Sequence, residues 1–217
     1  MVDTFQSLIP DTRAFLGELA ANNNRDWFLA NKDRYDSTLK RPAELLLEQA
    51  GANLNKALGA DVKTKLFRAN RDVRFSKDKT PYHQHLHMLW TADLGGRQPL
   101  GFFFGIGLEY ISIGAGLMGF EKDTLISWRA AIDGPLGADY QSQVEKLGQQ
   151  GFRIAEPELK RVPAPYDKEH PRGELLKRKS LSAWKDFEAG DIPAPTKALE
   201  TVFKDLVPLA QMLGGLR

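Results

Sequence analysis

Residues 99–120 have the sequence PLGFFFGIGLEYISIGAGLMGF, in which large apolar residues and glycines alternate. Phe102 and Phe104 would point to the same side of an extended chain, because side chains in a strand alternate between its two faces. The run therefore predicts two buried strands, at about 100–107 and 110–115, that form a hairpin.

The same run is long enough to cross a membrane, and its one charged residue is Glu109. A carboxylate in the middle of a membrane span costs about 2.5–3.5 kcal/mol. The run also contains six glycines, which fit tight strand packing better than a spanning helix. We therefore expect no membrane partner.

Helical patterns lie on both sides of this strand-rich centre. Asp11 or Thr12 is suited to cap a first helix that stops at residues 22–24, and Pro42 is expected to end or kink the second helix. This order predicts an α+β fold, a single globular domain over 1–217 that is helical at both ends, with helices packed on a mostly antiparallel β-sheet. The later helices are expected at about 122–132, 138–149 and 195–213, and further strands at about 61–69, 82–90, 152–154 and 180–187.

The composition excludes several classes of function. The 217 residues include no cysteine, which rules out disulfides, thiolate catalysis and cysteine-based zinc sites. A net charge of +2 is too small to indicate general binding to nucleic acid. Residues 1–5 show neither the basic nor the apolar part of a signal peptide, so we expect a cytoplasmic protein.

Positive charge is concentrated in residues 61–82, which hold seven cationic and three anionic side chains. Arg68, Arg71 and Arg74 follow one another at steps of three. A guanidinium group binds a carboxylate or a phosphate through two parallel hydrogen bonds. The local surplus of positive charge therefore indicates an anionic partner.

This basic segment supplies candidates for each role in a site. Asp72 and Asp78 would orient the arginines, and in an enzyme one of these two aspartates is the expected general base. Lys77 or Arg71 would then stabilise developing negative charge. The expected ligand-binding residues are Arg68, Arg71, Arg74, Ser76, Lys77, Lys79 and Tyr82, together with Lys32, Tyr35 and Arg129 from helical segments.

Three interpretations of the basic segment stay open. The first is a pocket for an anionic, phosphate-bearing small ligand, in an enzyme or a binding protein. The second is a non-catalytic interaction module that binds an acidic protein surface or nucleic acid, with Phe75 or Tyr82 stacking on a base. The third is an internal network of ion pairs that holds the fold. No reaction can be named, and no cofactor is implied.

Four motifs resemble a family of uncharacterised bacterial and fungal proteins, the domain of unknown function 2461. They are FRxNRDxRFSKDKxPY at 67–82, WFxxNKxxY at 27–35, GAGL at 114–117, and the segment 170–180 with its HP and LKxKS elements. The resemblance spans roughly residues 15–209. It implies an α+β fold and no assigned activity.

His83, His85 and His87 alternate along a predicted strand and would share one of its faces. They depart from the family pattern, in which lysine or a small polar residue is expected. Histidines at alternate strand positions can bind a metal, which makes these three weak metal candidates. The adjacent strand segment supplies no acidic ligand, so we expect a polar or ligand-facing strand.

Residues 114–119 match the spacing G-x-G-x-x-G of a dinucleotide-binding loop. That interpretation needs a βαβ unit and an acidic residue at the end of the next strand, and residues 133–139 have the composition of a turn instead. We expect these glycines to allow tight backbone packing or to line an anion pocket with their amides.

Overall fold

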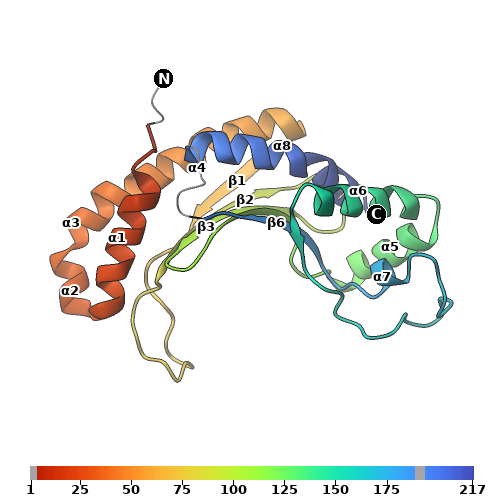
Figure 1. Ribbon diagram of the computed structural model, residues 1–217, viewed down its shortest axis with the longest axis horizontal. Helices are drawn as coiled ribbons and strands as arrows, with labels where there is room; N and C mark the ends of the chain where they lie inside the picture. Colours follow the sequence, from red (N-terminus) through yellow and green to blue (C-terminus); the bar gives the residue numbers. More distant parts are fainter. Residues whose placement is uncertain (1–3, 189–193) are drawn as a thin grey trace.

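The computed structural model describes residues 4–188 and 194–217, and its centre is a six-stranded antiparallel sheet (Figure 1). The strand order is β1-β2-β3-β4-β6-β5, and each neighbouring pair is antiparallel. The predicted α+β fold with helices at both ends is confirmed. The strands are β1 (Val62–Leu66), β2 (His85–Ala92), β3 (Leu100–Gly107), β4 (Ile111–Leu117), β5 (Arg153–Ile154) and β6 (Leu181–Asp186).

Two long helices, α4 (Arg41–Leu58) and α8 (Pro195–Gly214), cover one face of this sheet (Figure 1). The buried side chains alternate along β2 and β3, as the sequence pattern predicts. Phe203 of α8 packs edge-on against Trp90 and Phe102, with ring centroids 5.3 and 5.1 Å apart. The main hydrophobic core therefore lies between the sheet and these two helices.

The N-terminal helices form a second, smaller core with the chain that precedes β2. Phe15, Phe28 and Tyr82 are buried there, and Trp27 and Tyr35 pack against them. The helices are α1 (Leu8–Ala21), α2 (Arg25–Ala30), α3 (Lys32–Arg34) and the π-helical segment η1 (Tyr35–Lys40).

One predicted boundary in this region is wrong. The first helix begins at Leu8, before the expected caps, and Thr12 is buried inside it, because Leu8 and Ile9 extend the apolar stripe toward the core. The boundary at Pro42 is confirmed, because this proline lies in the first turn of α4, directly after the π-helical segment. A widened turn relieves the clash that a proline ring otherwise makes with the preceding turn.

The opposite end of the sheet is closed by α5 (Lys122–Asp133), α6 (Gly137–Gln149) and α7 (Gly173–Leu176) (Figure 1). Arg172 joins α5 to α7, because its Nε donates to the carbonyl of Ile132 at 2.7 Å and its Nη2 to that of Asp133 at 3.2 Å. These bonds satisfy carbonyls at the end of α5 that have no partner within the helix.

The second face of the sheet is open. Figure 1 shows the sheet arching beneath α4 and α8, with the chain at 67–84 and the chain at 155–172 extending beyond opposite ends of the arch. We call this face the inner face.

The described residues include no helix that is long and apolar enough to cross a membrane.

The G-x-G-x-x-G spacing does not form a dinucleotide loop. Gly114 and Gly116 lie within β4, which pairs antiparallel with β3 and β6, so the βαβ unit is absent from this place. Gly116 has a φ of +138°, and a Cβ atom there would clash with the carbonyl oxygen of Leu181. Tight backbone packing, one of the two expected roles, is confirmed at this glycine.

Candidate functional site

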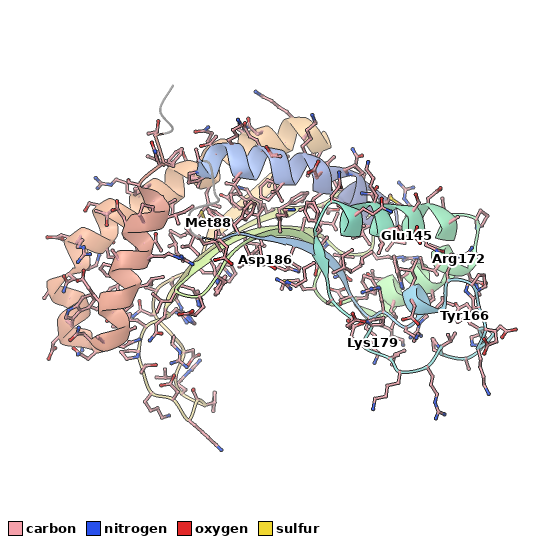
Figure 2. The ribbon with its side chains drawn as sticks, viewed as in Figure 1. Met88, Glu145, Tyr166, Arg172, Lys179 and Asp186 are labelled. Carbon is pink, nitrogen blue, oxygen red and sulfur yellow. The ribbon has the colours of Figure 1, made fainter. Side chains whose placement is uncertain are left out.

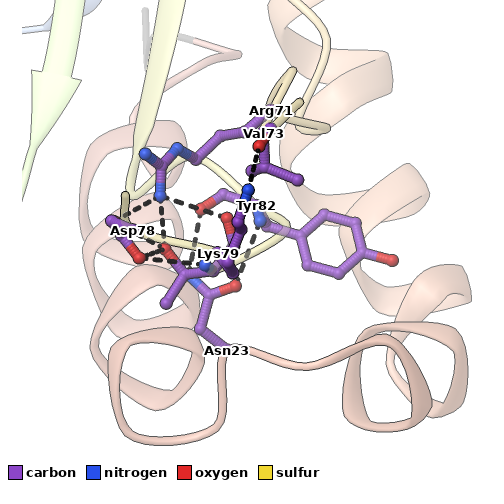
Figure 3. Close-up of polar contacts among 7 residues, drawn as sticks. Asn23, Arg71, Val73, Asp78, Lys79 and Tyr82 are labelled. Carbon is purple, nitrogen blue, oxygen red and sulfur yellow. Dashed lines mark hydrogen bonds and ion pairs between the residues drawn. The ribbon is translucent and has the colours of Figure 1, made fainter. Parts of the chain in front are cut away.

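The basic segment continues the β1–β2 hairpin beyond the sheet. An isolated bridge joins Asn70 to Tyr82, and the backbone N–H of Arg71 donates to the carbonyl of Pro81 at 2.8 Å. Figure 3 shows how Asn23 attaches this segment to the turn between α1 and α2. Its amide group donates to the Tyr82 carbonyl at 2.9 Å and accepts from the Tyr82 N–H at 3.1 Å.

Two arginines of the segment bind its two aspartates. Arg71 Nη1 donates to Asp78 Oδ2 at 2.5 Å and to the Thr80 carbonyl at 3.1 Å (Figure 3). Arg74 holds Asp72 with two hydrogen bonds of 2.9 and 2.6 Å. The Thr80 amide and Arg71 lower the pKa of Asp78 to about 2, and Arg74 lowers the pKa of Asp72. These two separate ion pairs neutralise both aspartates, but the Arg74–Asp72 pair is largely exposed, so the third interpretation stays a prediction.

The other candidates in the segment point to solvent or bind the backbone. Arg68 and Lys77 are exposed, and Lys79 Nζ donates to the carbonyl of Val73 at 3.0 Å. Ser76 is half-buried in the turn. Phe75 is 96% exposed, and the guanidinium of Arg74 lies 5.9 Å from its ring centroid.

The remaining predicted ligand-binding residues lie away from these cations. Tyr82 is buried and stacked on Phe28 with ring centroids 3.9 Å apart. Tyr35 packs in the same core, where burial raises its pKa to about 12. Lys32 pairs with Asp36, and Arg129 belongs to α5, at the far end of the sheet (Figure 1).

The three histidines lie on the inner face, as their alternation predicts. The rings of His83 and His85 are 4.6 Å apart, and those of His85 and His87 are stacked at 3.6 Å. Burial lowers the pKa of His85 to about 4 and that of His87 to about 3, so both rings are neutral at pH 7. Within residues 4–188 and 194–217 no group of three histidine or acidic side chains is arranged to hold a metal ion.

A cavity of about 840 Å³ occupies the inner face. Its lining comes from parts of the chain that are far apart in sequence, which include Arg13 on α1, Tyr110 between β3 and β4, and Trp184 on β6. Of the predicted candidates, the lining includes His87. Sequence reasoning missed the other lining residues because they come from several segments, at 13, 103–118, 153–155 and 180–188, that only the fold brings together.

Glycines leave room for two aromatic rings on the floor of this cavity. A Cβ atom at Gly114 would come within 2.5 Å of the Trp184 ring, and one at Gly105 within 2.7 Å of the Phe103 ring. Phe103 meets Trp184 edge-on, with ring centroids 5.3 Å apart and an angle of 71° between the rings. The two rings therefore need the glycines of β3 and β4 to reach these positions.

Polar groups border the aromatic floor. Asp186, which Figure 2 labels on the open side of the sheet, accepts from Ser112 Oγ at 2.5 Å and from Arg153 Nε at 2.6 Å. Arg153 lowers the pKa of Asp186, which stays ionised at neutral pH. The hydroxyl of Tyr110 forms a hydrogen bond with His87 Nε2, and burial raises the Tyr110 pKa, so the phenol is neutral at pH 7.

Arg13 lines the cavity and has no acidic partner in the part of the chain that the structure describes. It is half-buried, and its Nε donates to the carbonyl of Gly107 at 3.2 Å. No carboxylate of the described chain lies within 4 Å of its guanidinium nitrogens. Its remaining N–H groups are therefore free to bind an anion from solution.

Comparisons with known proteins give a family without an activity. Residues 11–212 match the family described as "Conserved hypothetical protein (DUF2461)". No curated protein and no solved structure matches the chain.

Proposed function

Because this chain belongs to the DUF2461 family, whose description names no activity, we propose a function from the geometry alone. The inner-face cavity binds a small anionic ligand in a cytoplasmic protein, and Arg13 is the residue that holds the anionic group. The volume of about 840 Å³ lies in the range of small-molecule sites. Its lining combines aromatic side chains such as Phe103 and Trp184 with charged and hydroxyl groups that can orient a ligand.

The observation that carries this proposal is the half-buried guanidinium of Arg13, which has no ion-pair partner among residues 4–188 and 194–217. A partly buried charge without a counter-ion costs free energy, and an anionic ligand would offset that cost. The arginines of the basic segment differ in this respect, because Arg71 and Arg74 already bind Asp78 and Asp72.

The other charges of the lining limit the ligand to few negative groups. Arg153 is neutralised by Asp186, and Glu109 and Glu188 add two carboxylates at the rim. A polyanion such as a nucleoside triphosphate would be repelled by these carboxylates. We therefore propose a ligand with a single phosphate or carboxylate group.

A thermal-shift screen tests this function with phosphate, sugar phosphates, carboxylic acids and nucleotides. A ligand at 100 times its dissociation constant stabilises a protein by about 2.7 kcal/mol, which is on the order of 5–10 °C for a chain of this length. We expect Arg13→Gln to abolish the shift and Arg25→Gln, a change at an exposed helical arginine, to preserve it. A flat panel contradicts the proposal. A shift that Arg13→Gln keeps and Arg68→Gln removes assigns the ligand to the basic segment instead.

A second function, an interaction module for nucleic acid, is favoured by the exposure of Phe75 beside Arg74. An exposed aromatic ring next to cations stacks on bases and attracts phosphates. We expect Phe75→Ser to weaken binding of a short single-stranded oligonucleotide in fluorescence anisotropy, with binding that falls steeply as salt rises. Equal affinity of the wild type and Phe75→Ser for the oligonucleotide would exclude this function.

A further inference from the structure

We infer that the ligand of the inner-face cavity carries a polyhydroxylated ring, as in a sugar phosphate or a sugar acid, and that this ring lies on the indole of Trp184. The inference rests on the proposed function, because the anionic group of the same ligand would bind Arg13. Three features of the cavity lead to it: a fixed aromatic platform, a mixed set of donors and acceptors beside it, and the negative rim.

The platform is held in one orientation. Trp184 lies against Gly114, and its Nε1 donates to Ser182 Oγ at 2.9 Å. Phe103 supports it from the side, with an angle of 71° between the two rings. A ring that is already immobile loses little entropy when a ligand stacks on it. The negative π-face attracts the weakly positive C–H groups on the apolar face of a sugar ring.

The hydroxyl-binding group stands two residues further along the same strand. Asp186 and Trp184 point to the same face of β6, because side chains two positions apart share a face. The Asp186 carboxylate has about four acceptor positions, and three of them receive hydrogen bonds from Ser112 and Arg153. One acceptor position on Oδ2 therefore remains.

Arg153 supplies hydrogen-bond donors beside the acceptor of Asp186. It has five N–H groups, of which two bind Asp186, so three remain for a ligand. Free donors thus stand beside a free acceptor on one rigid ion pair. A hydroxyl group both donates and accepts, and neighbouring hydroxyls on one ring would use both kinds of partner at once.

The carboxylates of the rim disfavour a nucleoside di- or triphosphate. Glu109 and Glu188 disfavour additional phosphates, whereas they can accept hydrogen bonds from hydroxyl groups. A flat base would also stack on Trp184, and the ribose of a nucleoside monophosphate also carries hydroxyl groups, so a hexose phosphate has to be compared with adenosine monophosphate directly. A sugar with one anionic group uses all of these residues.

Isothermal titration calorimetry with three probes tests the inference: inorganic phosphate, a hexose 6-phosphate and adenosine monophosphate. We expect the hexose phosphate to bind at least about tenfold more tightly than phosphate, and Trp184→Leu to reduce this ratio to about two or less while phosphate still binds. Trp184→Phe keeps a flat ring and should retain most of the ratio. Equal affinities for phosphate and hexose phosphate overturn the inference and leave the anion site intact.

Two further outcomes are decisive. Tighter binding of adenosine monophosphate than of the hexose phosphate overturns the inference of a sugar ring and indicates that a base stacks on Trp184. Failure of all three probes overturns the proposed function itself.

If Trp184→Leu does not fold, the intrinsic fluorescence of the wild-type protein provides the second readout. The hexose phosphate should change that fluorescence, the change should be absent in Trp184→Phe, and an unchanged signal in the wild type contradicts the stacking.

Discussion

The indole ring of Trp184 lies against the backbone of Gly114, so closely that a Cβ atom there would come within 2.5 Å of a ring carbon and 2.9 Å of the carbonyl oxygen of Ala183. The two residues are partners in register on β6 and β4. Glycine is therefore required at this position, because it makes room for the ring that forms the cavity floor.

Gly114→Ala should consequently displace Trp184 and destabilise the protein by about 1–3 kcal/mol, the usual cost of overpacking. Urea unfolding measures the loss, and the tryptophan emission spectrum reports the displaced ring. Gly119→Ala is the matched control, because nothing lies within 4 Å of a Cβ atom at that glycine. Equal stability of the two variants would show that Trp184 can move without cost.

The strands of this sheet could be predicted from the sequence, whereas the floor of the cavity could not. Alternation in residues 99–120 is a local signal, and the bounds of β3 and β4 lie within two residues of the predicted strands, although every residue of β4 is buried. Position 114 needs a glycine because it contacts Trp184, which stands seventy positions later in the chain. No sequence pattern marks Arg13 as a site residue, because only the packing of α1 against the end of β3 brings it to the cavity.

The basic segment shows a different limit of sequence reasoning. Its charge surplus was evident, and so were the aspartates that offset it. Which arginine binds which aspartate depends on the turn of the hairpin: Arg71 reaches Asp78 across it, while Arg74 folds back on Asp72. Spacing at steps of three contained no information on this pairing, because the segment is neither a helix nor a regular strand.

Arg71→Ala should loosen the basic segment rather than remove a ligand. The side chain is 22% exposed and binds both Asp78 and the Thr80 carbonyl across the hairpin. Loss of these bonds should speed chymotrypsin cleavage after the exposed Phe75 by on the order of fivefold, because local opening exposes the backbone to the protease. The measurement is the rate of appearance of the two fragments on a gel.

Arg68→Ala provides the comparison for this experiment, because Arg68 is exposed and makes no ion pair with the described residues. Its cleavage rate should equal that of the wild type. If Arg71→Ala is also cleaved at the wild-type rate, the ion pair with Asp78 does not hold the hairpin.

The neutral His87 should make the protein sensitive to acid. Its folded-state pKa of about 3 lies below the unfolded value near 6.5, so the unfolded state binds the proton more readily. Stability is complete above about pH 6.5 and is lost as pH falls toward 3. At pH 5 this corresponds to about 2 kcal/mol, which partial exposure of the ring reduces to about 1 kcal/mol.

His87→Gln should therefore lose about 1 kcal/mol less than the wild type between pH 7 and pH 5, because glutamine does not titrate. Urea unfolding at the two pH values measures the difference. His85→Gln is measured beside His87→Gln, because the stacked rings of His85 and His87 influence each other's titration. Identical losses in the wild type and His87→Gln would contradict the low pKa of His87.

Arg172→Ala should destabilise the protein through the end of α5. The guanidinium binds the carbonyls of Ile132 and Asp133, which are the negative end of the helix dipole. A lost charged hydrogen bond and two unpaired carbonyls predict a decrease of about 1.5–3 kcal/mol in the free energy of unfolding. Arg161→Ala, at an exposed arginine of the same loop, should change the free energy of unfolding by less than about 0.5 kcal/mol.

Arg172→Lys should recover only part of the stability that Arg172→Ala loses, since one ammonium group lacks the fork that binds two carbonyls. Full recovery with lysine would mean that charge alone stabilises this helix end, and that the geometry of the guanidinium is not needed.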